Sequence, residues 1–147
     1  MSKTTNDFAV CALLVGDCED GRLLMREVFR DAGWRLLEAP DPKRAMECLD
    51  RNLVQVVITS SELPNYNWKR LLNLLRRKKQ PPQLIVTSRT ADEGLWAEVL
   101  NCGGYDVLPQ PFRREEVERV VASARRHYDP APFYSRPRSS ASGTSLA

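Results

Sequence analysis

The sequence lacks a long apolar run, clustered cysteines and a strong excess of charge. No stretch approaches the ~20 apolar residues that span a bilayer. Residues 1–7 are polar, without the apolar segment of a signal peptide. The cysteines stand singly, without metal-ligand spacing, so we expect reduced thiols in a cytoplasmic protein at Cys11, Cys18, Cys48 and Cys102. The net charge of +3 does not by itself indicate nucleic-acid binding.

What is present is the composition of one soluble globular domain. The chain has 147 residues, of which 42% are hydrophobic and 28% charged, enough to bury a core. We expect a flexible N-terminus over residues 1–8 and a folded domain over residues 9–128. The last nineteen residues, 129–147, hold three prolines and five serines, which predicts a disordered tail. Phe133 and Tyr134, flanked by arginines, form a candidate binding motif in that tail.

Five short apolar segments alternate with five segments of helical spacing. We expect strands over residues 9–15, 34–39, 54–59, 84–87 and 105–108. The first helix carries Leu23, Leu24, Val28 and Phe29 at helical spacing and stops at Gly33. Further helices are expected over residues 42–49, 67–79, 92–100 and 114–127. This (βα)₅ pattern predicts an α/β fold, a parallel sheet with helices on both faces.

The polar residues of interest follow the expected strands. The β-branched run from Val56 to Thr59 suits a strand buried on both faces, and it leads into Ser60 and a loop that closes at Pro64. In an open α/β sheet, ligands gather outside the carboxyl ends of the strands. Ser60 is therefore expected at the functional edge of the sheet.

These landmarks resemble the receiver domain of two-component response regulators. The resemblance covers residues 9–128 and implies a flavodoxin-like three-layer sandwich with sheet order 2-1-3-4-5. It rests on four strand ends, Leu14-Val15-Gly16-Asp17, Ile58-Thr59-Ser60 with Leu63-Pro64, Val86-Thr87-Ser88 and Leu108-Pro109-Gln110-Pro111-Phe112.

The resemblance also implies that the phosphorylation pocket has lost its charges. Ser60 stands where the family has its phosphoacceptor aspartate, Gly16 replaces the first of two acidic metal ligands, and Gln110 replaces a lysine. Asp17 keeps the second acidic position, and Thr87 keeps the hydroxyl that contacts the phosphoryl group. Mg²⁺ prefers carboxylates, so this pocket is expected to bind it poorly.

Ser60 is also a poor substitute nucleophile. A serine hydroxyl needs an adjacent base, and the only histidine, His127, lies near the end of the last expected helix. We therefore expect a degenerate pseudo-receiver that is not an enzyme, has no cofactor and acts through protein–protein contacts. The expected partners are a histidine kinase, another receiver or an output protein, with nucleic acid and membrane unlikely partners.

Three other interpretations stay open. Asp17 and Glu62 are candidates for a non-standard Mg²⁺ site that keeps phosphoryl transfer, instead of a helix cap and a solvated loop charge. Ser60 is a candidate for phosphorylation by a kinase, instead of a loop serine that satisfies backbone groups. The third is a flavodoxin-like small-ligand binder, although the acidic turn after the first strand would repel phosphate.

The resemblance makes two further predictions about the fifth strand. The aromatic switch position of the family is Val107 here; Tyr105, two residues earlier, is expected on the same face of the strand by alternation. Together they define the expected output face. The peptide bond before Pro111 is expected to be cis.

Two sets of residues receive structural explanations. The segment over residues 67–79 carries six basic side chains, which we expect on a solvated helix face: Lys69, Arg70, Arg76, Arg77, Lys78 and Lys79. The tryptophans are expected to be packing residues: Trp34, Trp68 and Trp96.

Overall fold

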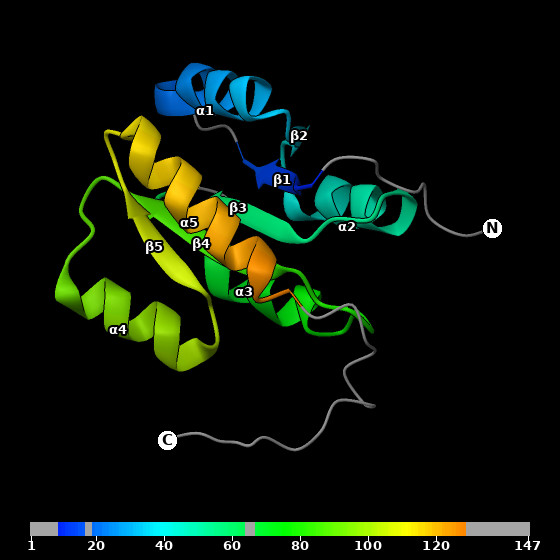
Figure 1. Ribbon diagram of the computed structural model, residues 1–147. Helices are drawn as coiled ribbons and strands as arrows, with labels where there is room; N and C mark the ends of the chain where they lie inside the picture. Colours follow the sequence, from blue (N-terminus) through cyan, green and yellow to red (C-terminus); the bar gives the residue numbers. More distant parts are fainter. Residues whose placement is uncertain (1–8, 17–18, 64–66, 129–147) are drawn as a thin grey trace.

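Five strands and five helices alternate along the chain, as the sequence predicts (Figure 1). The computed structural model describes residues 9–16, 19–63 and 67–128. The elements are β1 (Cys11–Val15), α1 (Glu19–Ala32), β2 (Arg35–Ala39), α2 (Pro42–Arg51), β3 (Val56–Ser60), α3 (Trp68–Leu75), β4 (Gln83–Ser88), α4 (Glu93–Cys102), β5 (Asp106–Pro109) and α5 (Arg114–Arg126).

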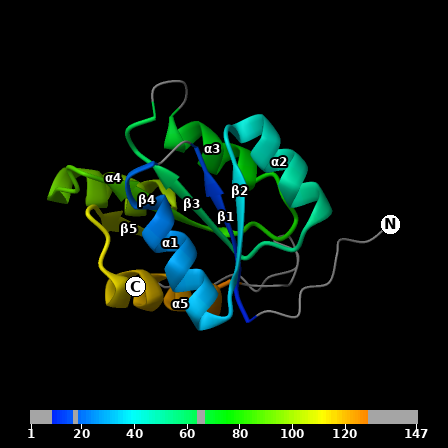
Figure 2. The ribbon, with the colours of Figure 1, turned by 90° about the horizontal axis from the view of Figure 1, so that it is seen from above.

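The strands form one parallel sheet in the order β2-β1-β3-β4-β5. Helices α1 and α5 cover one face and α2, α3 and α4 the other, which makes three layers (Figure 2). Every residue of β1 and β3 is buried. Because both faces are covered, the central strands are continuous apolar runs instead of alternating ones. The expected fold class and strand order are confirmed.

Alternation along the strands divides the core into two clusters. Ile58, Ile85 and Leu108 point to the side of α1 and α5, where they pack with Phe29 and Val121. Their sequence neighbours on each strand point to α2, α3 and α4: Val57, Leu84, Val86 and Val107. A residue's parity in its strand therefore decides which helical layer it faces.

Most helix boundaries follow their sequence signals. Gly33, with a φ of +74°, ends α1 in the left-handed region that glycine adopts most easily. Asp41 caps α2 by accepting a hydrogen bond from the Arg44 amide at 2.8 Å. Asp92 caps α4 in the same way through the Leu95 amide, also at 2.8 Å.

Two helix assignments from the sequence need correction. Helix α3 ends at Leu75, not at Lys79, and residues 76–79 form turns ahead of Pro81 and Pro82. In α1, Leu23 is 70% exposed although it is predicted with the core residues, and Met25 is buried. The spacing of Leu23 was misjudged, because at 3.6 residues per turn it lies on the side of α1 away from the buried Met25, Val28 and Phe29.

The cysteines that the structure describes are free thiols, Cys11 buried and Cys48 and Cys102 half-buried. Burial raises the pKa of Cys11 to about 11 and also raises the pKa of Cys48. Both thiols are therefore protonated at neutral pH and weakly nucleophilic. Cys18 lies outside the described residues.

The tryptophans have three different environments. Trp68 is buried, and Trp34 packs edge-on against Phe29 with ring centroids 5.5 Å apart. Trp96 is 50% exposed, so the prediction that all three are packing residues is wrong for Trp96. Its indole N–H donates to Asp106 at 2.9 Å, which satisfies the polar end without burying the ring.

Two glycines near helix starts should respond oppositely to alanine. At Gly21, φ is +98° and a Cβ would lie 2.5 Å from the Phe112 ring; at Gly94, a Cβ would meet only Asp92 Oδ1, at 3.5 Å. We expect Gly21→Ala to lower the free energy of unfolding by about 1–3 kcal/mol through strain and overlap. Gly94→Ala should raise it by about 0.5–1 kcal/mol through helix propensity. Urea unfolding of both variants measures the difference, and a stabilised Gly21→Ala would contradict the close approach of Phe112.

Candidate functional site

The site is built where β3 and β4 end. Ser60 is the last residue of β3, and the strand register places it beside Thr87 of β4. By alternation, both side chains share the side of Ile58 and Ile85, which is covered by α1 and α5. Only 7% of Ser60 and 1% of Thr87 are exposed. The structure thus brings together two predicted site residues as buried neutral hydroxyls.

The Thr87 hydroxyl is unusual because it is buried and finds no hydrogen-bond partner among the described residues. A hydroxyl in this position costs about 1–3 kcal/mol in desolvation. Thr59, one residue before Ser60 in β3, is different, since its hydroxyl donates to the Val15 carbonyl at 3.3 Å. Among the described residues, Thr87 is therefore a buried polar group at the site that no hydrogen bond satisfies.

Ser60 is engaged with its own loop. Its hydroxyl oxygen accepts a hydrogen bond from the Glu62 amide at 3.0 Å, a local turn that serine commonly forms. The only histidine, His127, lies near the amino ends of the strands. Its carbonyl accepts a hydrogen bond from the side chain of Gln83, the first residue of β4, at 2.8 Å. No histidine base is therefore near Ser60, and its hydroxyl is not activated for nucleophilic attack.

The exposed side chain of Glu62 also makes hydrogen bonds within the domain. Its carboxylate accepts from the Ser88 hydroxyl at 3.3 Å and from the Arg89 amide at 3.1 Å. The charge is therefore exposed to solvent as expected, and the carboxylate also ties the loop after β3 to the end of β4. Sequence reasoning missed this contact because it depends on the separation of two loops, which no local pattern encodes.

The described residues do not fit Mg²⁺ well. Glu62 is the carboxylate that they offer near Ser60, and it is committed to Ser88 and Arg89. No group of three or more His, Cys, Asp or Glu side chains suited to a metal occurs in residues 9–16, 19–63 and 67–128. Gly16 offers no side chain, and its φ of +104° is one that residues with side chains rarely adopt. Asp17 lies outside the described residues.

Gln110 lies beside this pocket on the neighbouring strand end. The backbone N–H of Gln110 donates to the Ser88 carbonyl at 2.9 Å. The Gln110–Pro111 peptide bond is cis, as the resemblance to receivers predicts. A groove of about 550 Å³ opens next to it between α1 and the turn after β5, lined by Gly21, Leu24, Arg89, Gln110, Pro111 and Phe112.

The arrangement of strand ends matches a known family. The profile of the response regulator receiver domain matches residues 12–122. The chain belongs to this family. The receiver domain therefore accounts for the parallel sheet, the strand order and the position of Ser60 and Thr87 at its carboxyl edge.

Similar proteins are bacterial regulators. The transcriptional regulatory protein YrkP of Bacillus subtilis is 33% identical over 120 residues, covering 78% of this chain and 49% of that protein. The transcriptional regulatory protein CpxR of Escherichia coli is 31% identical over 119 residues, covering 79% and 50%. The chain thus spans about half the length of these curated relatives.

A solved structure shows the same fold. The signal receiver domain of an HD domain-containing protein from Pseudomonas fluorescens has a TM-score of 0.70 at 23% identity, covering 81% of this chain and 96% of that one. No helix in the described part of this receiver domain is long and apolar enough to cross a membrane.

The expected output face is not arranged as predicted. Val107 points to the layer of α2, α3 and α4, whereas Tyr105 packs on the side of α1 and α5. The prediction that they share a face is wrong, because Tyr105 precedes β5 and escapes its alternation. Its hydroxyl is hydrogen-bonded to Ser123 and lies 3.1 Å from Nδ1 of His127, which holds the ring on α5.

The basic residues of the segment over 67–79 are mostly exposed, as expected, but only Lys69 and Arg70 lie on α3. Lys69 pairs with Glu98, Lys78 pairs with Asp50, and the Arg76 guanidinium donates to the Cys102 carbonyl. These contacts tie α3 and the turn after it to α2 and α4. Three of these six basic side chains thus make contacts within the receiver domain.

A matched pair of threonines tests the unsatisfied hydroxyl. We expect Thr87→Val to raise the free energy of unfolding by about 1 kcal/mol, because valine has a similar shape and no polar group to desolvate. Thr59→Val should lower it by about 1 kcal/mol, since the bond to the Val15 carbonyl is lost. Chemical denaturation of both variants gives the comparison. Equal losses in the two variants would mean that Thr87 has a partner in solution.

Proposed function

We propose that this receiver domain is a pseudo-receiver, a signalling module that acts through protein contacts without being phosphorylated. The observation that carries the proposal is the buried pair of Ser60 and Thr87 at the carboxyl edge of the sheet. An aspartate at the position of Ser60 would place an ionised nucleophile beside the Thr87 hydroxyl. Serine leaves two neutral hydroxyls there, with no histidine near Ser60 to act as a base.

The other substitutions support the same interpretation. A lysine at the position of Gln110 would be a desolvated cation once the acidic groups are gone, and burying an unpaired charge is costly. Glutamine keeps hydrogen bonding without the charge. Asp17 is assigned a structural role in this proposal, as a cap of the following helix, where a negative charge is favourable. The pocket thus remains stable as a neutral structure.

A phosphorylation-driven switch is also unsupported at the output residues. Val107 is aliphatic and buried, and the Tyr105 ring is held against α5 by Ser123 and His127. A ligand shifts a conformational equilibrium only if it distinguishes two states. Without phosphorylation of Ser60, the domain would present one constitutive surface.

The partners proposed for that surface are other signalling proteins: a histidine kinase, a second receiver or an output protein. The module itself would catalyse no reaction, need no cofactor and act in the cytoplasm. Nucleic acid is not proposed as a partner, because part of the basic segment after Asn67 is paired within the domain. The relatives named as transcriptional regulators are about twice as long as the matched region.

A titration with a phosphoryl mimic tests the proposal directly. Beryllofluoride with Mg²⁺ should produce no saturable shift of the amide signals of Ser60, Thr87 and Gln110 in a ¹⁵N–¹H spectrum. Mg²⁺ alone should also produce no saturable shift, because the Glu62 carboxylate is hydrogen-bonded to Ser88 and Arg89. Saturable, Mg²⁺-dependent shifts at these residues would favour the alternative, an active receiver with Asp17 and Glu62 at a non-standard metal site.

Restoring the nucleophile alone should not restore the reaction. We expect Ser60→Asp to gain no phosphoryl mass on incubation with acetyl phosphate and Mg²⁺. The metal-ligand position of Gly16 and the lysine position of Gln110 would still be neutral. The triple variant Gly16→Asp, Ser60→Asp and Gln110→Lys should gain it, at some cost in stability from the φ of +104° at Gly16. Intact-protein mass spectrometry measures both. Phosphorylation of the single variant would show that the rest of the pocket is still competent.

A further inference from the structure

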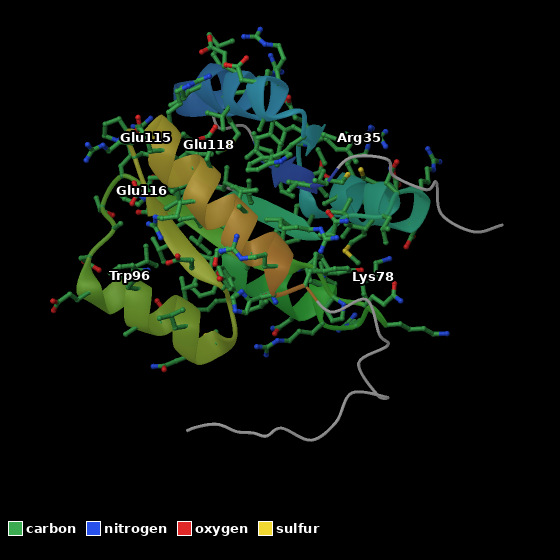
Figure 3. All side chains as sticks on the ribbon, viewed as in Figure 1. Arg35, Lys78, Trp96, Glu115, Glu116 and Glu118 are labelled. Atoms are coloured by element: carbon green, nitrogen blue, oxygen red, sulfur yellow. The ribbon has the colours of Figure 1, made fainter. Side chains whose placement is uncertain are left out.

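A groove lies on the face formed by α4, β5 and α5. Its volume is about 150 Å³, and its walls include Asp92 and Trp96 from α4 and its cap, Asp106 from β5, and Glu116 and Arg119 from α5. Figure 3 shows Trp96 and Glu116 on the two helices that flank β5. Trp96 is 50% exposed, and Leu100, one helical turn further on, is 51% exposed. An aromatic and an aliphatic side chain thus remain uncovered on this face.

The charge of the groove is negative. Three carboxylates, Asp92, Asp106 and Glu116, border it with one guanidinium, Arg119. One guanidinium does not balance three carboxylates: Asp106 accepts a hydrogen bond from the neutral Trp96 indole at 2.9 Å, and Glu116 forms an ion pair with Arg119 at 4.0 Å. A groove of this kind favours a segment that carries arginine together with aromatic side chains.

We propose that the segment over residues 133–138 of the same chain, Phe133-Tyr134-Ser135-Arg136-Pro137-Arg138, docks in this groove. These residues lie outside the described part of the chain. The segment offers what the groove lacks, two aromatic rings beside Trp96 and Leu100, and two guanidinium groups for the carboxylates. Arginine can also stack on an indole face.

The path from the end of the domain to the groove is short. Glu116, Arg119, Ser123 and His127 recur every three or four residues and share one side of α5. Arg119 precedes Tyr128 by nine residues, which is about 13 Å along a helix. Phe133 follows Tyr128 by five positions, and in an extended polyproline-like conformation five steps reach about 15 Å. The tail can therefore fold back along α5 and bring Phe133 to the groove.

The connecting segment is suited to this path. Residues 129–132, Asp-Pro-Ala-Pro, contain two prolines, and proline-rich spacers are extended and semi-rigid. A stiff spacer loses less conformational entropy on docking than a flexible one. The docked segment would cover the face that α4, β5 and α5 offer to partners, so it would regulate access to that face. This consequence rests on the proposed function, but docking itself does not require an unphosphorylated Ser60.

The test uses the full chain and the indole N–H signal of Trp96, assigned by its loss in Trp96→Phe. We expect the double substitution Phe133→Ser, Tyr134→Ser to shift this signal and to increase acrylamide quenching of the exposed tryptophan. Arg136→Glu with Arg138→Glu should give the same shift, whereas Ser139→Ala with Ser140→Ala, in the same tail, should leave the signal unchanged.

Two results would overturn the proposal. One is a Trp96 signal that is identical in the full chain and in both variants of the docking segment. The other is a signal that moves with protein concentration in the unsubstituted chain, which would assign the groove to a second copy. The phosphoryl-mimic titration is read at Ser60 and Thr87 instead, so failure of one proposal is distinguishable from failure of the other.

Discussion

Parallel pairing of β3 with β4 is the interaction on which the rest of the site depends. The register sets Ser60 directly beside Thr87, and alternation turns both toward α1 and α5. The same pairing leads the loop after β3 to the end of β4, where Glu62 binds Ser88 and Arg89. The edge that would hold a phosphoryl group in this family is thus closed by hydrogen bonds among neutral groups and one engaged carboxylate.

The chemistry of the pocket follows from what the sheet places there. The Thr87 hydroxyl is buried and has no hydrogen-bond partner among the described residues, which costs free energy of folding. It lies beside Ser60 at the carboxyl edge of the sheet. The close approach of Phe112 to Gly21 brings α1 and the turn after β5 together beside this pocket.

On the α4 side of the sheet, the position of Tyr105 decides which side chains line the surface. Tyr105 is fixed to α5 by its hydroxyl, so it does not occupy the space beside Val107 on the α4 side of β5. Trp96 spans part of that region instead, anchored to Asp106. The half-exposed indole therefore lies among carboxylates on the surface of α4, β5 and α5.

The sequence by itself determined the alternation of strands and helices, the buried central strands, the caps at Asp41 and Asp92 and the glycine end of α1. These depend on local propensity and on apolar periodicity, which a chain carries residue by residue. The resemblance to receivers supplied the strand order and the pocket positions. Only the tertiary structure decided the rest: the exposure of Leu23 and Trp96, the early end of α3, the two faces of Tyr105 and Val107, and the partners of Glu62. Each of these depends on which surfaces meet across the sheet and between loops. Residues far apart in the sequence form those contacts, so no local pattern encodes them.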